Sequence, residues 1–362
     1  MMSLGFLGVQ MAFTLQISQM SRIFQTLGAD PNNLGWFFIL PPLAGLIVQP
    51  IIGSLSDRTW APRLGGRRLP YLILGTVVAA IVMLLLPNSG SFGFGYASMA
   101  ALVFGAITVA FLDLSSNVAM QPFKMMVGDM VNDDQKSYAY GIQSFLLNTG
   151  AVIAAIFPFL LTLFGVANTA SKGVIPNSVI WSFYIGAAIL VVSTIITIAR
   201  VREYDPVTYA KYHGIDESAN KSGGNWLALL KKAPKVFWLV ALVQFFCWMA
   251  FQYLWTYSTG AMAANVWHTT NSSSAGYQAA GNWYGILSAV QSVAAVVWSY
   301  VLAKVPNNRH KLGYALSLLL GAIGFFSIFF IHSQSALVVS FILVGMAWAA
   351  MNTYTLTMVT NA

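Results

Sequence analysis

The stretch GSLSDRTWAPRLGGRRLP, residues 53–70, is polar and basic, and it joins two apolar runs at residues 33–55 and 70–87. A helix of roughly 20 apolar residues crosses a bilayer core about 30 Å thick, so each run is close to membrane length. Because lipid offers no hydrogen-bond partners to an irregular backbone, such runs are expected to be helices rather than open strands. The stretch therefore predicts a short turn between two membrane helices.

The rest of the chain repeats this pattern. Of its 362 residues, 57% are hydrophobic and only 8% are charged, which is the composition of a membrane protein. Ten runs of membrane length predict an all-α, polytopic fold. The runs are residues 4–26, 33–55, 70–87, 96–124, 137–165, 178–200, 236–260, 278–303, 312–332 and 335–360.

The charged residues sort by loop. The net charge is +8, but the basic residues are not gathered into a soluble basic domain, so we expect no nucleic-acid partner. If the ten helices alternate in direction, sixteen of the eighteen basic residues fall on one side, and only Arg22 and Lys172 fall on the other. The positive-inside rule then predicts that the N-terminus lies in the cytoplasm.

The longest polar segment, residues 201–234, separates six apolar runs from four. This arrangement predicts two parallel repeats: a six-helix bundle at 1–200, a cytoplasmic linker at 201–234, and a partial bundle of four helices at 235–362. The second set is two helices short of the first. We therefore expect either a truncated chain or an incomplete repeat, and we expect the ten helices alone not to transport.

The turn at residues 53–70 resembles the signature loop of the major facilitator superfamily, in which such charges hold a cytoplasmic gate. Gly53 permits close approach of a neighbouring helix, Asp57 is suited to a helix N-terminus, and the arginines can form ion pairs. A purely topological role for the arginines is the alternative. The gate residues that this resemblance implies are Gly53, Asp57, Arg58, Arg67, Arg68 and Asp129.

Residues 111–129, FLDLSSNVAMQPFKMMVGD, narrow the resemblance. They resemble the sucrose and α-glucoside transporters of the glycoside-pentoside-hexuronide group, although Lys124 stands where the sucrose transporters have arginine. The linker is more similar to bacterial members. The resemblance implies proton-coupled import of a disaccharide such as maltose or sucrose by alternating access, in a bacterial inner membrane.

Helical geometry places the polar residues of this stretch on one face. Relative to Asp113, a helix puts Asn117 at about 40°, Gln121 at about 80° and Lys124 at about 20°. Lys124 lies about 16 Å along the axis from Asp113, too far for a direct ion pair. An aspartate at this depth is costly when ionised and usually faces a cavity or pathway, so Asp113 is the candidate proton-coupling residue. A buried polar contact between helices and an end-of-helix lysine are the structural alternatives.

Sugar recognition requires amides and hydroxyls for ring oxygens and aromatic faces for apolar sugar faces. Arg22 either contacts the sugar or anchors the first helix at the interface. Aromatic candidates are equally compatible with packing. The candidate sugar contacts are Asn117, Gln121, Lys124, Arg22, Gln244, Trp248, Gln252 and Asn352, with Gln143 and Asn148 as weaker ones.

Enzyme classes find no support in the sequence. The four histidines lack metal-ligand spacing, and neither a Walker loop nor a nucleophile elbow is present. We therefore expect no enzyme activity, no metal and no cofactor, and we expect a monomer whose partners are a small sugar, protons and the lipid bilayer. The alternatives are a transporter-derived sensor or scaffold, a carrier for another solute, or coupling to sodium.

Overall fold

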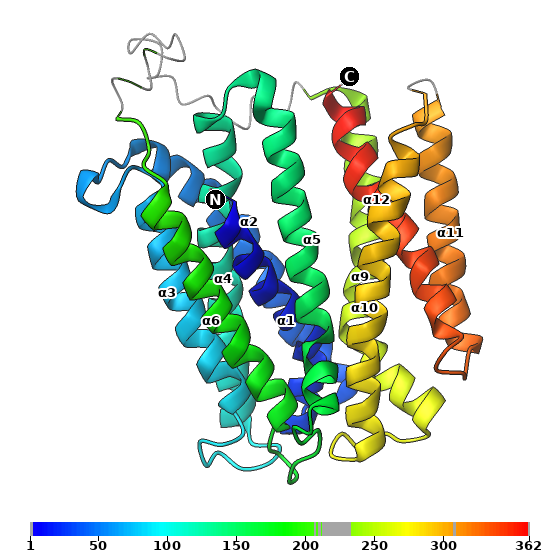
Figure 1. Ribbon diagram of the computed structural model, residues 1–362. Helices are drawn as coiled ribbons and strands as arrows, with labels where there is room; N and C mark the ends of the chain where they lie inside the picture. The colour runs from blue at the N-terminus through cyan, green and yellow to red at the C-terminus, as the bar shows by residue number, and fades with distance from the viewer. Residues whose placement is uncertain (1–2, 206–207, 209–210, 212–232, 307–308, 361–362) are drawn as a thin grey trace. The chain divides into compact units, whose positions relative to one another are not determined.

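The computed structural model of the chain describes residues 3–205, 208, 211, 233–306 and 309–360. These residues form long helices with short connections (Figure 1), and no β-strand occurs among them beyond one isolated bridge between Ala61 and Gly66. The helices are α1 Leu4–Leu27, α2 Leu34–Arg58, α3 Leu69–Leu85, α4 Met99–Met130, α5 Asp133–Leu163, α6 Asn177–Arg200, α9 Lys235–Trp267, α10 Ala275–Leu302, α11 His310–Phe330 and α12 Leu337–Thr360.

The predicted all-α membrane fold is confirmed, and each of the ten predicted runs corresponds to a helix. Within the described residues, nine helices are long and apolar enough to cross a membrane. The remaining one, α1, carries several amides and Arg22 and is buried along most of its length. Helices α4 and α9 extend furthest past the predicted ends, to Met130 and Trp267, because hydropathy marks the membrane core and not the end of helical hydrogen bonding.

The surface of α3 shows why these helices belong in lipid. Its buried face carries Leu72, Gly75, Thr76 and Ala79, whereas large apolar side chains cover the opposite face. Leu74, Val77, Ile81 and Leu84 are each about half exposed. Such an apolar outer surface would be unfavourable in water, and it costs nothing against acyl chains.

The chain divides into two compact units. The first comprises Met1–Glu203 and Trp255–Ala289, and the second comprises Tyr204–Leu254 and Val290–Ala362. Helices α9 and α10 each contribute to both units, so the packing units differ from the repeats expected along the sequence. Most of the predicted linker lies outside the described residues, and the predicted boundaries at 200 and 235 stay a prediction.

Small residues set the helix packing in the first unit. Helix α1 packs on α4, α5 and α6, while α4 also packs on α2 and α3. A Cβ added at Gly8 would come 2.5 Å from the Leu190 Cα, and one added at Gly75 would come 2.6 Å from the Ala119 nitrogen. In the second unit, α11 packs on α12, and the Trp298 indole N–H donates to the Ser317 hydroxyl at 2.9 Å. Close backbone approach replaces hydrophobic collapse as the main source of cohesion in lipid.

Gly150→Ala is expected to destabilise the first unit. An added Cβ would lie 2.5 Å from the carbonyl oxygen of Leu7, so α1 and α5 must separate. Overpacking of this kind costs about 1–3 kcal/mol. The measurement is thermal unfolding in detergent. Gly53→Ala is the matched control, because an added Cβ there meets nothing within 4 Å. Equal melting temperatures for the two variants would show that the close contact of α1 with α5 is unimportant.

Candidate functional site

The centre of α4 carries a cluster of one carboxylate and three amides, which we call the Asp113 cluster. The Gln16 side-chain amide donates to one carboxylate oxygen of Asp113 at 3.3 Å, and the Asn117 amide donates to the other at 2.8 Å. The Gln49 side-chain amide donates in turn to the side-chain oxygen of Asn117 at 2.6 Å. Three helices, α1, α2 and α4, therefore meet at Asp113.

Asp113 is buried without a cation. Asp113 is only 7% exposed. No Lys or Arg among the described residues forms an ion pair with its carboxylate. Gly45 makes room for the cluster, since an added Cβ would sit 3.3 Å from the Asn117 nitrogen. The Gln16 carbonyl oxygen is buried without a donor among the described residues. An acid held only by neutral amides can gain or lose a proton without breaking an ion pair.

The other two residues of the polar face predicted on α4, Gln121 and Lys124, lie in less buried surroundings. Gln121 is half-buried, and Lys124 is exposed towards the end of the helix. The predicted stripe thus divides into a buried part, Asp113 and Asn117, and an accessible part. Lys124 makes no ion pair with Asp113, as helical geometry predicts.

A second cluster lies at the end of the first unit where α3 begins, and we call it the basic-end cluster. Asp129 accepts from Arg67 at 3.2 Å and from Arg68 at 2.5 Å. Glu203, just after α6, accepts from the backbone N–H groups of Arg68 and Leu69 at 2.8 and 3.0 Å. The cluster ties the α2–α3 turn to α4 and to the end of α6.

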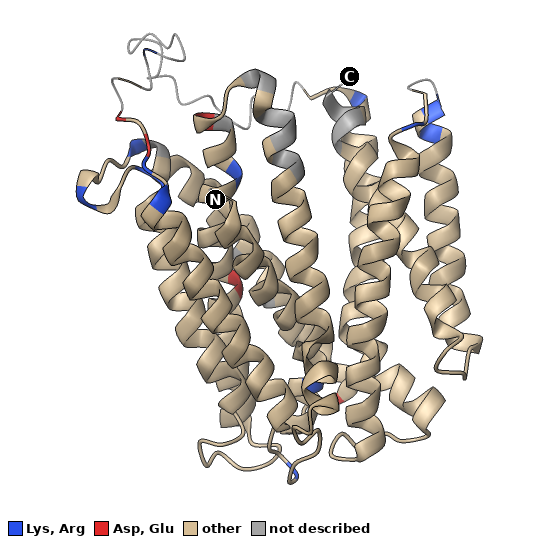
Figure 2. Cartoon of the chain, in the orientation of Figure 1, with Lys and Arg blue, Asp and Glu red and all other residues tan. Residues whose placement is uncertain are grey.

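Two opposing effects act on the Glu203 carboxyl. Burial raises the pKa of Glu203, whereas hydrogen bonds from the Arg68, Leu69 and Arg67 backbone N–H groups and the nearby Arg68 charge lower it. These N–H groups lie at the N-terminus of α3, on its first residue and the two residues before it, where the helix dipole favours a negative charge. Figure 2 shows Lys and Arg gathered at one end of the helices in each unit, which is the pattern behind the predicted sidedness.

The other predicted gate residues are placed differently. Arg58 is exposed at the last turn of α2, and the side chain of Asp57 lies outside the described part of the structure. A Cβ added at Gly53 would meet none of the described atoms within 4 Å, and the close helix approach predicted there stays a prediction. Deeper in α2, a Cβ added at Gly45 would lie 3.3 Å from the Asn117 amide nitrogen of α4.

Asp129→Asn is expected to lower stability by about 3 kcal/mol, because the substitution removes two charged hydrogen bonds, one of them to an arginine that is 3% exposed. Thermal unfolding in detergent measures the effect. Arg63→Gln, an exposed charge of the same turn, should change the melting temperature little. Similar losses for both variants would mean that the pairing of Asp129 contributes nothing specific.

The third cluster surrounds Arg22 near the opposite end of α1, and we call it the Arg22 cluster. The Arg22 Nε donates to the side-chain oxygen of Gln278 at 2.5 Å, and its Nη2 donates to the side-chain oxygen of Asn168 at 2.8 Å. Its Nη1 donates to Asn282 at 3.0 Å and to Gln19 at 3.3 Å. The guanidinium thus joins α1, the α5–α6 loop and α10 within the first unit.

Arg22 carries an uncompensated charge. It is 0% exposed, and no Asp or Glu among the described residues forms an ion pair with it. Its four acceptors are neutral amide oxygens, and Gly281 lies so close that an added Cβ would be 2.7 Å from the Arg22 Cδ. Amides satisfy the donors but give less electrostatic stabilisation than a carboxylate would. The cluster is well formed, yet it lacks the strongest partner that arginine can have.

Four predicted sugar contacts belong to the second unit. The Gln244 amide donates to the Met351 carbonyl at 3.3 Å, which joins α9 to α12. The exposed Trp248 packs edge-on against Trp348, with ring centroids 5.6 Å apart. Gln252 is half-buried on α9. The exposed Asn352 donates to the Trp348 carbonyl of its own helix at 2.8 Å. All four lie on the two helices that pack together here.

The two weaker candidates make hydrogen bonds that already account for their polarity. The Gln143 amide is buried and donates to the Phe123 carbonyl at 2.9 Å, linking α5 to α4. The Asn148 amide donates to the Ser144 carbonyl one turn earlier at 2.8 Å. Neither residue reaches the Asp113 cluster through these bonds.

Several residues of the clusters were not predicted from the sequence. They are Gln16, Gln49, Asn168, Glu203, Gln278 and Asn282. Gln49 carries the same signal as Asp113, a polar side chain in the middle of an apolar run. Gln278 and Asn282 are four residues apart, and therefore share a helix face. Asn168 and Glu203 lie in loops, where no periodicity marks them.

The chain is similar in sequence to several sucrose transport proteins of plants. Over 260 residues it is 23% identical to a sucrose transport protein of Arabidopsis thaliana, covering 67% of this chain and 50% of that one. It is 26% identical over 269 residues to a sucrose transport protein of Oryza sativa, covering 67% and 51%. The chain thus spans about half the length of the curated relatives that it matches.

Solved structures share its fold. A mutant of the nucleoside transporter NupG superposes with a TM-score of 0.66 at 15% identity, covering 97% of this chain and 79% of that one. The xylose transporter XylE from E. coli gives 0.65 at 15% identity, covering 99% and 85%. The family model described as Major Facilitator Superfamily matches residues 2–362. The chain therefore belongs to the Major Facilitator Superfamily.

Proposed function

We propose that the protein is a secondary active transporter that imports a small neutral sugar together with protons, by alternating access. Two lines of similarity support this proposal. Relatives in the curated set are named sucrose transport proteins, and one structure with the same fold is titled a D-xylose-proton symporter. An α-glucoside disaccharide such as maltose or sucrose is the substrate that we favour.

The observation that carries the proposal is Asp113, a buried carboxyl surrounded by amides. A carboxylate removed from water is unfavourable, and an ion pair with Lys or Arg would fix it in the charged form. Here neutral Gln16 and Asn117 are its hydrogen-bond partners. Such a group can change protonation with the access of water, which is what a proton-coupling site requires.

The neighbouring amides suit both protonation states. As donors, Gln16 and Asn117 stabilise the carboxylate at its two oxygens. The Gln16 side-chain carbonyl oxygen is buried and has no donor within the described part of the chain, and it can accept the O–H of a protonated Asp113 once the amide turns over. Because Asn117 links Asp113 to Gln49, protonation of Asp113 changes how this amide is presented to a sugar hydroxyl.

For sugar contact we propose Asn117, Gln121 and Lys124 in the first unit, and Gln244, Trp248, Gln252 and Asn352 in the second. Both sets supply hydrogen-bonding groups, and the second unit adds an aromatic face. Arg22 is assigned a different role. Its guanidinium is fully buried and donates to four amide oxygens, which supports a structural role for it in this state.

The Arg22 cluster is proposed as a latch. It binds α1 to α10 and to the α5–α6 loop, and opening on this side of the membrane requires those bonds to break. Amide acceptors allow this because water can replace them at little cost, whereas a buried carboxylate partner would hold the arginine much more strongly. At the other end, Gly53, Asp57, Arg58, Arg67, Arg68 and Asp129 remain the proposed gate, with Glu203 added.

The same proposal covers the setting of the protein. We propose a monomer in a bacterial inner membrane. The N-terminus is placed in the cytoplasm because basic residues concentrate at one end of the helices in each unit. The Arg22 cluster then lies on the outer side.

The function is tested by uptake of labelled sugars into vesicles that contain the complete protein. A panel of α-glucosides, hexoses and pentoses should give accumulation of at least one sugar, and a proton uncoupler should abolish it. Accumulation that follows a sodium gradient would replace the proton by sodium. Binding of sugar without uptake of any member of the panel would favour a sensor or scaffold and contradict the proposal.

A further inference from the structure

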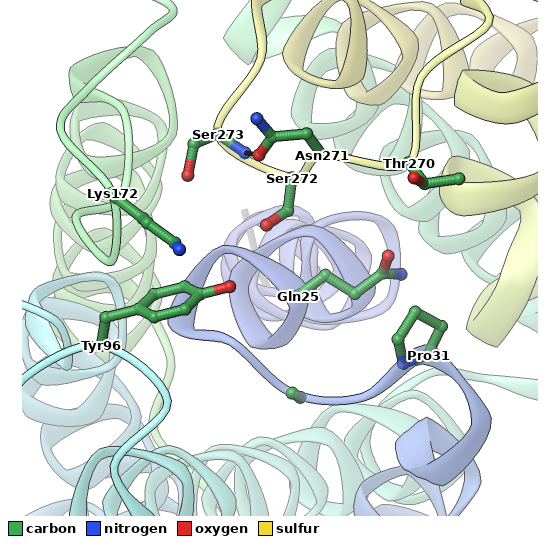
Figure 3. Close-up of a pocket in the computed structure, with 9 residues that line it drawn as sticks. Gln25, Pro31, Tyr96, Lys172, Thr270, Asn271, Ser272 and Ser273 are labelled. Carbon is green, nitrogen blue, oxygen red and sulfur yellow. Dashed lines mark hydrogen bonds between the residues drawn. The ribbon is translucent and has the colours of Figure 1, made fainter.

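A polar cavity lies in the first unit, beside the Arg22 cluster, and shares no residue with the Asp113 cluster. Its volume is about 430 Å³, within the range of about 300–1,000 Å³ that small-molecule sites occupy. Figure 3 shows side chains from separate segments around a common space, among them Gln25, Tyr96, Lys172 and Ser272.

The walls of the cavity are held in place before any ligand arrives. The Ala97 N–H donates to the Leu27 carbonyl at 2.8 Å, which fixes the segment of Tyr96 against the end of α1. Lys172 lies over the Tyr96 ring, with its Nζ 4.2 Å from the centroid. The side-chain oxygen of Asn271 accepts from the Ser273 backbone N–H at 3.0 Å, a bond drawn in Figure 3.

The lining selects the chemistry of a ligand. It offers amides from Gln25 and Asn271, hydroxyls from Ser272 and Ser273, and the aromatic ring of Tyr96. The Ser273 hydroxyl is buried and has no hydrogen-bond partner among the described residues. Hydroxyls, amides and an aromatic ring are the groups that bind a polyhydroxylated ring.

Charge argues against other ligands. Among the described residues, the lining contains no Asp or Glu, so a cation has no counter-ion there. The same described lining holds one cation, Lys172, whose ammonium already lies over the Tyr96 ring. An anion is usually held by several donors and charges. An uncharged ligand with many hydroxyl groups fits the lining best.

The cavity is joined to the Arg22 cluster by a single side chain. Gln278 accepts from Arg22 through its carbonyl at 2.5 Å and donates from its amide to the Ser272 carbonyl at 2.6 Å. One amide therefore connects the buried arginine to the α9–α10 loop that forms part of the cavity wall. If the bonds of Arg22 break, the Gln278 side chain that supports this loop loses its charged partner.

We propose that this cavity is a second sugar-binding site, which takes a neutral mono- or disaccharide while the Arg22 cluster is closed. The ligand class follows from the lining itself and does not depend on the Asp113 cluster. Since Gln278 supports both structures, sugar in the cavity stabilises the closed latch, and release of the latch weakens the site. The site thus couples sugar binding to the closed form of the Arg22 cluster, and this coupling rests on the latch role proposed above.

The test is protection of an engineered thiol. In a Cys247→Ala background, Thr270→Cys places a thiol on the exposed rim of the cavity, and Thr169→Cys places one on an exposed loop outside it. Glucose, sucrose and maltose are the probes, with sulfate as the anion control. We expect at least one sugar to slow alkylation of Thr270→Cys about threefold or more near saturation, and to leave Thr169→Cys unchanged.

Further variants separate this site from the proposed transport site. Protection should persist when Asn117→Ala disables the Asp113 cluster, and it should be lost with Asn271→Ala or Ser273→Ala, which remove hydrogen-bonding groups from the lining. Absence of sugar uptake by the unmodified protein, with intact protection of Thr270→Cys, would leave this proposal standing while the transport proposal fails. Protection by sulfate alone, no protection by any sugar, or loss of protection with Asn117→Ala would overturn it.

Discussion

Asp113→Asn is expected to abolish uphill sugar accumulation while exchange of internal for external sugar continues. Asparagine keeps the size and the hydrogen bonds of a protonated aspartate but cannot release a proton. Gln16 and Asn117 remain its neighbours, so the sugar-binding form of the cluster is retained. Uptake driven by a proton gradient, measured beside sugar counterflow in proteoliposomes of the complete protein, separates the two activities.

The pH dependence of this variant has a defined sign. If sugar binds to the protonated carrier, the affinity of the unmodified protein for sugar falls as the external pH rises, because Asp113 then loses its proton. With Asp113→Asn the affinity should be independent of pH over the same range. Asp30→Asn, at an exposed acid that caps a short helical turn, is the control and should behave as the unmodified protein does. Proton-driven accumulation by Asp113→Asn would assign Asp113 to packing.

Arg22→Ala is expected to release the latch. The change leaves the buried oxygens of Gln278, Asn282 and Asn168 without their charged donor. Hydrogen bonds to charged groups contribute about 1.5–3 kcal/mol each, and 1.4 kcal/mol is a tenfold change in an equilibrium. The open form should therefore gain at least about tenfold in population relative to the closed form.

The readout is a thiol at Ala280 on α10, a position that is 0% exposed in this structure. In the Cys247→Ala background, alkylation of Ala280→Cys by a membrane-impermeant maleimide should accelerate about tenfold with Arg22→Ala. Arg63→Ala, at an exposed arginine of the α2–α3 turn, serves as the control and should leave the rate unchanged. An unaltered rate with Arg22→Ala would make the cluster a static anchor of α1.

The fold was predictable because the physics of the bilayer constrains the sequence strongly. Runs of apolar residues place every long helix, since a spanning segment must be both apolar and internally hydrogen-bonded. Helix ends were less predictable. The helix α4 continues through Lys124 and Asp129 to Met130, because polar residues at the membrane surface remain compatible with helical hydrogen bonds.

The clusters were only partly predictable, because each depends on which helices meet. Asp113 and Asn117 share a helix face, and their direct contact follows from their spacing of four residues. Their links to Gln16 and Gln49 depend on how α1 and α2 cross α4, which hydropathy does not encode. The distance in sequence between Arg22 and Gln278, or between Arg68 and Glu203, explains why neither contact was predicted.

The central claim is that sugar and protons move together through a step that needs Asp113. The most direct measurement places a pH-sensitive dye inside proteoliposomes of the complete protein and adds a transported sugar outside, with no imposed gradient. The interior should acidify as sugar enters, and Asp113→Asn should take part in sugar exchange without acidification. Sugar entry without acidification in the unmodified protein, or equal acidification in Asp113→Asn, would contradict the claim.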